Sequence, residues 1–250
     1  MASKHTIEPT RLSVALTSCG RFDLLETTLA SFLDHFEAPR ILVGEDAALP
    51  AEAAAFAHRH PEIEMRANPS KLGQMRSIDA LYAAITTPYV LHLEDDWEFT
   101  AGADLGSVMD LLDARDDISV CAVAYRLDPR FRASAKTETY RGKTYLVWDL
   151  DAHSKWFSYS FNPSVARLSM WRELGPFARF NTEEGLSAAC KQRVLRIAMI
   201  ERPIARHIGE KRHAHDPFQP RRATTLFSRL RRSASKRWPI ASAGERVQCR

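Results

Sequence analysis

The residues with the most evident chemistry in this sequence are three consecutive carboxylates, Glu94-Asp95-Asp96. They directly follow residues 89–93 (YVLHL), a mostly apolar run typical of a buried strand. Three adjacent anions repel one another unless a cation or hydrogen-bond donors compensate them. Mg²⁺ or Mn²⁺ could do so, because these ions use one or two protein carboxylates together with water and substrate phosphates. The position after a strand favours this metal site over an acidic solvated turn.

The elements that must position this triplet alternate between strand and helix. Apolar runs and helical spacing predict strands at 12–16, 40–44, 63–66 and 89–93, and helices at 24–32, 51–60 and 74–85. Such alternation predicts an α/β fold with a mostly parallel central sheet flanked by helices, whose ligands bind beyond the carboxyl ends of the strands. The triplet lies at one of these ends.

The second half of the sequence is less regular. It predicts helices around 108–112, 169–174 and 183–193, a strand at 120–125, a polar loop or hairpin at 130–143, and extended segments at 197–200 and 204–208. We expect one domain over residues 1–216 and a basic C-terminal tail over 217–250 that is amphipathic or disordered.

Charge and cysteine content restrict the cellular setting. The formal net charge is +4, but the part of the tail from 217 to 244 holds seven basic residues and no acidic one, so the rest of the chain is near −3. The basicity therefore belongs to the tail and not to a nucleic-acid-binding surface of the whole domain. The four cysteines show no CxxC spacing, and no run of apolar residues is long enough to cross a bilayer. We expect a soluble cytoplasmic protein, or one that is peripheral at the inner face of a membrane.

The tail itself allows three interpretations. Leu226, Phe227 and Leu230 fall among its cations at spacings that suit one side of a helix, a pattern that fits the surface of an anionic membrane. A disordered solubilising tail or a contact with nucleic acid fits the same residues.

The order of motifs resembles that of GT-A glycosyltransferases, in particular the inverting glycosyltransferase family 2. The resemblance covers roughly residues 11–210 and rests on four stretches: VALTSCGRFDLLETTLASF, ILVGED, NPSKLGQMRSIDALYAAITTPYVLHLEDDWEF and RHIGEKRH. The third stretch is the most specific, because it joins an Asn, a Leu-Gly pair and a small-residue helix to a strand and an acidic triplet, here an E-D-D form of the D-x-D signature.

This resemblance implies a GT-A (Rossmann-like) fold and a nucleotide-sugar site. It implies nucleotide-sugar contacts from Thr17, Arg21, Asp46, Asn68, Lys71, Gly73, Arg76, Glu94 and Asp95. In the same way it makes Asp96 and His207 the ligands of Mn²⁺ or Mg²⁺, and imidazole and carboxylate both suit manganese.

Inverting transfer also needs a base that takes the proton of the acceptor hydroxyl. Thr182-Glu183-Glu184 is typical of an ordinary helix start, with a capping Thr and acidic residues in the first turn. The family has an E-D pair at a similar place, with the Asp as base. Here the pair is Glu-Glu, which favours Glu184 and leaves Glu183 open.

The sequence therefore predicts a metal-dependent glycosyltransferase that moves a sugar from a nucleoside-diphosphate sugar to a hydroxyl acceptor on a glycan, a lipid or another molecule. A nucleotidyltransferase is the alternative enzyme, but it would need a glycine-rich phosphate loop, and the first loop holds only Gly20. A non-enzymatic nucleic-acid-binding protein that uses the basic tail is the third hypothesis. The donor sugar, the nucleobase, the acceptor and the oligomeric state are not determined by the sequence.

Overall fold

The computed structural model describes residues 3–38, 40–124, 132–210, 212, 214 and 217. The chain divides into two units, 1–219 and 220–250, and all of the described residues belong to the first. Apart from Pro217, the basic tail expected at 217–250 lies outside the described residues, so its membrane and nucleic-acid interpretations stay sequence-based predictions.

The described part of the chain alternates strands and helices as the sequence indicates. The helices are α1 (Phe22–His35), α2 (Pro50–Arg59), α3 (Gln74–Tyr82), α4 (Leu105–Ala114), α6 (Leu168–Leu174), the 3₁₀ helix η1 (Phe177–Phe180) and α7 (Glu183–Gln192). The strands are β1 (His5–Thr6), β2 (Leu12–Ser18), β3 (Phe36–Glu37), β4 (Ile41–Glu45), β5 (Ile63–Ala67), β6 (Tyr89–Glu94), β7 (Trp97–Phe99), β8 (Ile118–Ala122), β9 (Lys136–Tyr140), β10 (Lys143–Val147), β11 (Ser164–Arg167), β12 (Arg196–Ile200) and β13 (Ala205–His207).

Nine strands form the central sheet in the order β5-β4-β2-β6-β11-β8-β12-β10-β9. The four strands from β5 to β6 are parallel, as expected, because helices connect them. In the other half β11 enters antiparallel between β6 and β8, and β9 and β10 form an antiparallel hairpin. The α/β fold is thus confirmed, while the sheet is mixed and not parallel along its whole width.

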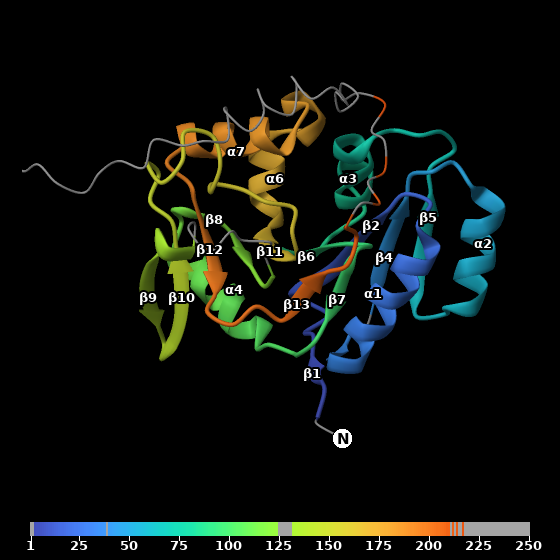
Figure 1. The fold of residues 1–250 in the computed structure, drawn as a ribbon, viewed down its shortest axis with the longest axis horizontal. Coiled ribbons are helices and arrows are strands. Elements are labelled where there is room, and N and C mark those ends of the chain that lie inside the picture. Colours follow the sequence, from blue (N-terminus) through green and yellow to red (C-terminus); the bar gives the residue numbers. More distant parts are fainter. Residues whose placement is uncertain are drawn as a thin grey trace, which may run out of the picture. The chain divides into compact units, whose positions relative to one another are not determined.

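Each face of the sheet packs on its own hydrophobic core, because alternate strand residues point to opposite faces. In β2, Val14 and Leu16 pack with α1 and α4, whereas Ala15 packs with α3, α6 and α7. Figure 1 shows α3, α6 and α7 together on one side of the sheet, with α1 and α4 on the other. The sheet is therefore covered on both faces, as its apolar strands predicted.

The carboxyl ends of β4, β2 and β6 lie next to one another in the parallel half of the sheet. Beyond β6 the chain turns at once into the short strand β7, which pairs with β13 from the end of the described chain. The short strands β7 and β11 are not predicted from the sequence, because segments of three or four residues show too little periodicity. Among the described residues no helix is long and apolar enough to cross a membrane.

Candidate active site

Asp95 lies at the centre of the candidate site and is fully buried. Its Oδ2 atom accepts hydrogen bonds from the Ser18 hydroxyl (3.0 Å) and the Arg21 Nε (3.2 Å), and a second Arg21 nitrogen pairs with Oδ1. Its backbone carbonyl accepts from the Thr28 hydroxyl at 2.8 Å. Burial raises the pKa of Asp95 to about 6, although the Arg21 charge opposes this rise. Asp95 thus ties the end of β6 to β2 and α1.

Asp96 and His207 face each other across the β7–β13 pairing. His207 pairs with Trp97, the residue that directly follows Asp96 in the sequence. The Nε2 atom of His207 lies 3.4 Å from Asp96 Oδ2. The Ile208 amide donates to the Asp96 carbonyl at 2.8 Å. Gly209 packs so closely that a Cβ there would come within 2.3 Å of Asp96 Oδ2. The structure therefore brings together the two residues that the resemblance assigned to a metal.

The chemistry of this pair fits a divalent cation. Asp96 Oδ1 and His207 Nδ1 are buried and have no hydrogen-bond partner within the described part of the chain. An unsatisfied buried carboxylate oxygen is costly, and a cation would compensate it. No group of three His, Cys, Asp or Glu side chains converges on a metal position among the described residues. Two protein ligands are enough for Mg²⁺ or Mn²⁺ when diphosphate oxygens and water complete the coordination.

Arg21 compensates the acidic triplet from the loop before α1. Besides its contacts with Asp95, Arg21 donates to Asp96 Oδ2 at 2.9 Å and to the Arg212 carbonyl at 2.8 Å. The Arg212 side chain pairs with Asp23 in the first turn of α1. The structure thus places Arg21 against two carboxylates, whereas the resemblance implied a contact with the nucleotide.

Glu94 is the last residue of β6 and the first of the triplet. Its Oε1 accepts a hydrogen bond from Gln74 Nε2 at 3.1 Å, at the start of α3. Burial, followed by the charges of Asp96, Glu183 and Asp95, holds the pKa of Glu94 well above its usual range. Gln74 was not among the predicted site residues, although it directly follows Gly73 in the sequence.

Asp46 organises the loop that leads into α3. Its carboxylate accepts hydrogen bonds from the amides of Leu72 (2.7 Å) and Gly73 (2.8 Å) and from Asn68 Nδ2 (2.8 Å). Gly73 has φ +82°, in the left-handed region that favours glycine. Asp46, Asn68 and Gly73 therefore meet at one loop, and their assignment to the nucleotide side stays a prediction.

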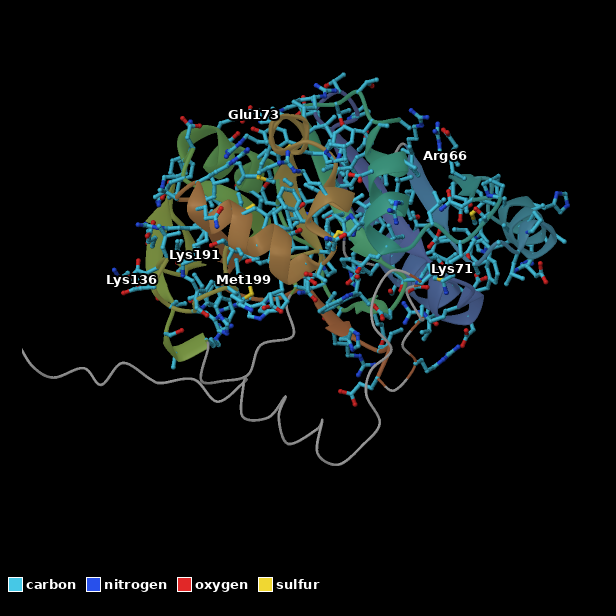
Figure 2. The ribbon with its side chains drawn as sticks, turned by 90° about the horizontal axis from the view of Figure 1, so that it is seen from above. Arg66, Lys71, Lys136, Glu173, Lys191 and Met199 are labelled. Atoms are coloured by element: carbon cyan, nitrogen blue, oxygen red, sulfur yellow. The ribbon has the colours of Figure 1, made fainter. Side chains whose placement is uncertain are left out.

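The remaining residues assigned to the nucleotide side lie in different settings. The Thr17 hydroxyl donates to the Leu93 carbonyl at 3.3 Å, between neighbouring strands. Lys71 is half-buried, and its charge acts on the nearby Cys19 thiol, while Arg76 is exposed on α3. Figure 2 shows Lys71 and Arg66 at the side of the sheet that carries α2 and β5, and Lys191 at the side of α7. The nucleotide contacts of these residues stay predictions.

Glu183 and Glu184 start α7 behind the Thr182 cap but point to different partners. Glu183 accepts from the Phe161 amide at 3.2 Å, and burial raises its pKa. Its charge also contributes to the raised pKa of Glu94. Glu184 pairs with Lys155 at 2.7 Å, and its side chain is 40% exposed. The Glu183 carboxylate is thus held by a backbone amide, while the Glu184 carboxylate is partly exposed and paired with Lys155.

Comparison with known proteins gives a family match and several similar folds. A family model described as glycosyl transferase family 2 matches residues 13–171. None of the curated proteins matches the sequence. A mannosyltransferase from Pyrobaculum calidifontis, solved with GDP-Man and Mn²⁺, has a TM-score of 0.55 and 14% identity, covering 81% of this chain and 58% of that one.

Residues 1–349 of S. aureus TarS form a second similar structure. Its TM-score is 0.50 and its identity 11%, covering 78% of this chain and 59% of that one. The same region has been solved with UDP, at 10% identity. The chain thus spans less than two thirds of the length of both neighbours, and at these identities the likeness concerns the fold alone.

Proposed function

Because the chain belongs to glycosyl transferase family 2, we propose that it transfers a sugar from a nucleoside-diphosphate sugar to a hydroxyl acceptor with inversion, and that it requires Mn²⁺ or Mg²⁺. The observation that carries the proposal is the pair of Asp96 and His207 beyond the end of β6, with a buried carboxylate oxygen that lacks a partner among the described residues. Similar folds bind GDP-Man with Mn²⁺, or UDP, which supports a nucleotide-sugar donor.

Asp96 and His207 would hold the cation, which neutralises the charge that develops on the departing diphosphate. Arg21 lies beside the same position, so its guanidinium is available to a phosphate group when the donor binds. The loop that Asp46 organises borders the ends of β4 and β2, where a nucleoside would lie. Glu94, kept toward its neutral form by burial, can donate a hydrogen bond to a sugar or ribose hydroxyl.

Glu184 would act as the base. A base has to be reachable by an acceptor that arrives from solvent, and Glu184 meets this requirement because its side chain is partly exposed. It would take the proton of the acceptor hydroxyl while that oxygen attacks the anomeric carbon and the diphosphate departs from the opposite side. Glu183, bonded to the Phe161 amide, would anchor the start of α7.

The basic tail supports a further part of this proposal, namely a peripheral location on the cytoplasmic side of a membrane. Its seven cations would attract anionic lipid, and the site would then lie near a lipid-linked acceptor in the same membrane. Flotation with vesicles that contain phosphatidylserine tests this point. A full chain that floats no better than a chain cut after Asp216 would contradict it.

A turnover assay with a panel of donors tests the activity. UDP-glucose, UDP-N-acetylglucosamine and GDP-mannose would each be incubated with the full chain, Mn²⁺ and either EDTA or buffer, and release of the nucleoside diphosphate would be measured. We expect turnover of at least one donor that EDTA abolishes. Turnover that is unchanged by EDTA would contradict the metal requirement, and release of pyrophosphate from nucleoside triphosphates would favour the nucleotidyltransferase instead.

A further inference from the structure

Asp79, in the middle of α3, accepts three hydrogen bonds from a different part of the chain. Its Oδ1 accepts from the indole Nε1 of Trp171 and from the Phe177 amide, both at 2.8 Å, and its Oδ2 accepts from the Ala178 amide at 2.9 Å. Phe177 and Ala178 begin η1, and the first amides of a helix have no partner within it. Asp79 therefore caps η1 from another element, through hydrogen bonds that its charge strengthens.

The other end of α3 is fixed to the donor side of the site. Gln74, the first residue of the helix, donates to Glu94, and the Asp46 carboxylate binds the amides of Leu72 and Gly73 just before it. Because Asp79 is on the same short helix, its position relative to the acidic triplet is set by helix geometry.

The segment that Asp79 caps leads directly to the base. From η1 the chain passes through Asn181, which has φ +60°, to the Thr182 cap and the two carboxylates that start α7. The end of η1 packs tightly against the first turn of α7, because a Cβ at Gly185 would lie 2.4 Å from the Phe180 carbonyl oxygen. A displacement of η1 would therefore be passed on to the first turn of α7.

Aromatic packing connects η1 to the same carboxylates. Phe177 is fully buried, with its ring centroid 5.9 Å from that of Tyr82 on α3 and 5.6 Å from that of Phe161. The Phe161 amide in turn donates to Glu183. Asp79 fixes the amide of the residue at the centre of this cluster.

We propose that Asp79 is a positioning residue that sets the distance between the donor site and the base-bearing helix α7. It contacts no substrate in this account, and the inference rests on the proposed glycosyl transfer. Loss of Asp79 should impair the chemical step and leave nucleotide binding intact, because Asp46 holds the donor loop independently.

The test compares Asp79→Asn with Trp171→Phe and with Asp104→Asn. In Asp79→Asn one of the two acceptor oxygens becomes an NH₂ group that faces an N–H donor, whereas Trp171→Phe removes one donor and keeps a ring beside Tyr82. Asp104 caps α4 on the opposite face of the sheet by accepting from the Ser107 amide, so its substitution controls for the general loss of a capping carboxylate.

We expect kcat for the donor that the wild type turns over to fall about tenfold to a hundredfold in Asp79→Asn, since small misplacements of reacting groups have effects of this size. The loss in Trp171→Phe should be smaller, and Asp104→Asn should keep the wild-type kcat. Dissociation constants for UDP and GDP with Mn²⁺, measured by calorimetry, should stay within about twofold of the wild type in all three. Amide exchange should rise over residues 177–186 in Asp79→Asn and remain unchanged over 68–76.

Two results would overturn the proposal while glycosyl transfer stands. One is a kcat in Asp79→Asn that falls no further than in Asp104→Asn. The other is a loss of nucleotide affinity that matches the loss of kcat. A wild-type protein that turns over no donor would instead overturn the proposed function itself.

Discussion

The imidazole Nε2 of His207 lies 3.4 Å from Oδ2 of Asp96, although the two residues come from distant parts of the sequence. The short antiparallel pairing of β7 and β13 creates this proximity, and the carbonyl of Asp96 continues it by accepting from the Ile208 amide. A metal site built in this way depends on backbone pairing as much as on its ligands. Changes that disturb the pairing should therefore act like changes of the ligands themselves.

Gly209→Ala is such a change. The added Cβ would meet Asp96 Oδ2 at 2.3 Å, so either Asp96 or the segment after β13 has to move. We expect the Mn²⁺ concentration for half-maximal turnover to rise about tenfold or more, a size typical of disturbed metal surroundings. Gly106→Ala is the matched control, because its nearest neighbour, Asp104 Oδ1, is 3.2 Å away and α4 tolerates alanine there. An unchanged manganese requirement in Gly209→Ala would speak against the site.

Glu184→Gln and Glu183→Gln separate the two carboxylates of α7. If Glu184 is the base, its replacement should lower kcat about a hundredfold or more and leave donor binding unchanged, because the proton acceptor is lost. Glu183→Gln can still accept from the Phe161 amide and should have the milder effect. Turnover assays with both variants decide the assignment, and it would be wrong if Glu184→Gln stayed active while Glu183→Gln did not.

Arg21→Met should strongly destabilise the fold. Asp95, whose side chain is 1% exposed, would lose its cationic partner, and removing one member of a buried pair costs about 3–5 kcal/mol. Arg40→Met is the control, because both side chains of the Arg40–Glu64 pair are well exposed and such pairs contribute at most about 1 kcal/mol. Urea unfolding at pH 7 measures both variants. Equal losses of stability would show that the pairing of Arg21 with the triplet contributes little.

Asp95 should make stability fall as pH rises through its folded-state pKa. Burial raises this pKa to about 6 from 3.8. Between these values the folded state binds more protons than the unfolded state, so the contribution of this group is fully present below about pH 4 and is lost above about pH 6. The unfolding free energy of the wild type minus that of Asp95→Asn should thus decrease from pH 4 to pH 7. A difference that increases over this range would contradict the burial argument.

The N-terminal, parallel half of the fold could be predicted from the sequence because its signals are local. The apolar run that ends at Glu94, and the helical spacing after Gly73, both depend on neighbouring residues, and both elements lie where expected. In the second half, β11 inserts antiparallel between two strands that come before it in the sequence. Nothing within its four residues specifies those partners, because they are chosen by the packing of the whole sheet.

In the candidate site, too, local features could be predicted from the sequence, whereas contacts between distant segments could not. His207 could be assigned from a motif, but its contact with Asp96 depends on the three-residue strand β7, which has no periodicity of its own. The different partners of Glu183 and Glu184 are Phe161 and Lys155, which come from a separate segment. Contacts of this kind follow from tertiary packing, and a sequence pattern contains them only where a family motif records them.

Calorimetry of UDP and GDP binding with and without Mn²⁺ shows whether Asp96 and His207 hold a catalytic cation. In the wild type, Mn²⁺ should strengthen the binding of one of these nucleotides about tenfold or more, since the cation bridges the protein to the diphosphate. Asp96→Asn and His207→Ala should each remove most of this gain and leave the weak metal-free binding unchanged. Manganese enhancement of the same size in both variants would contradict the claim.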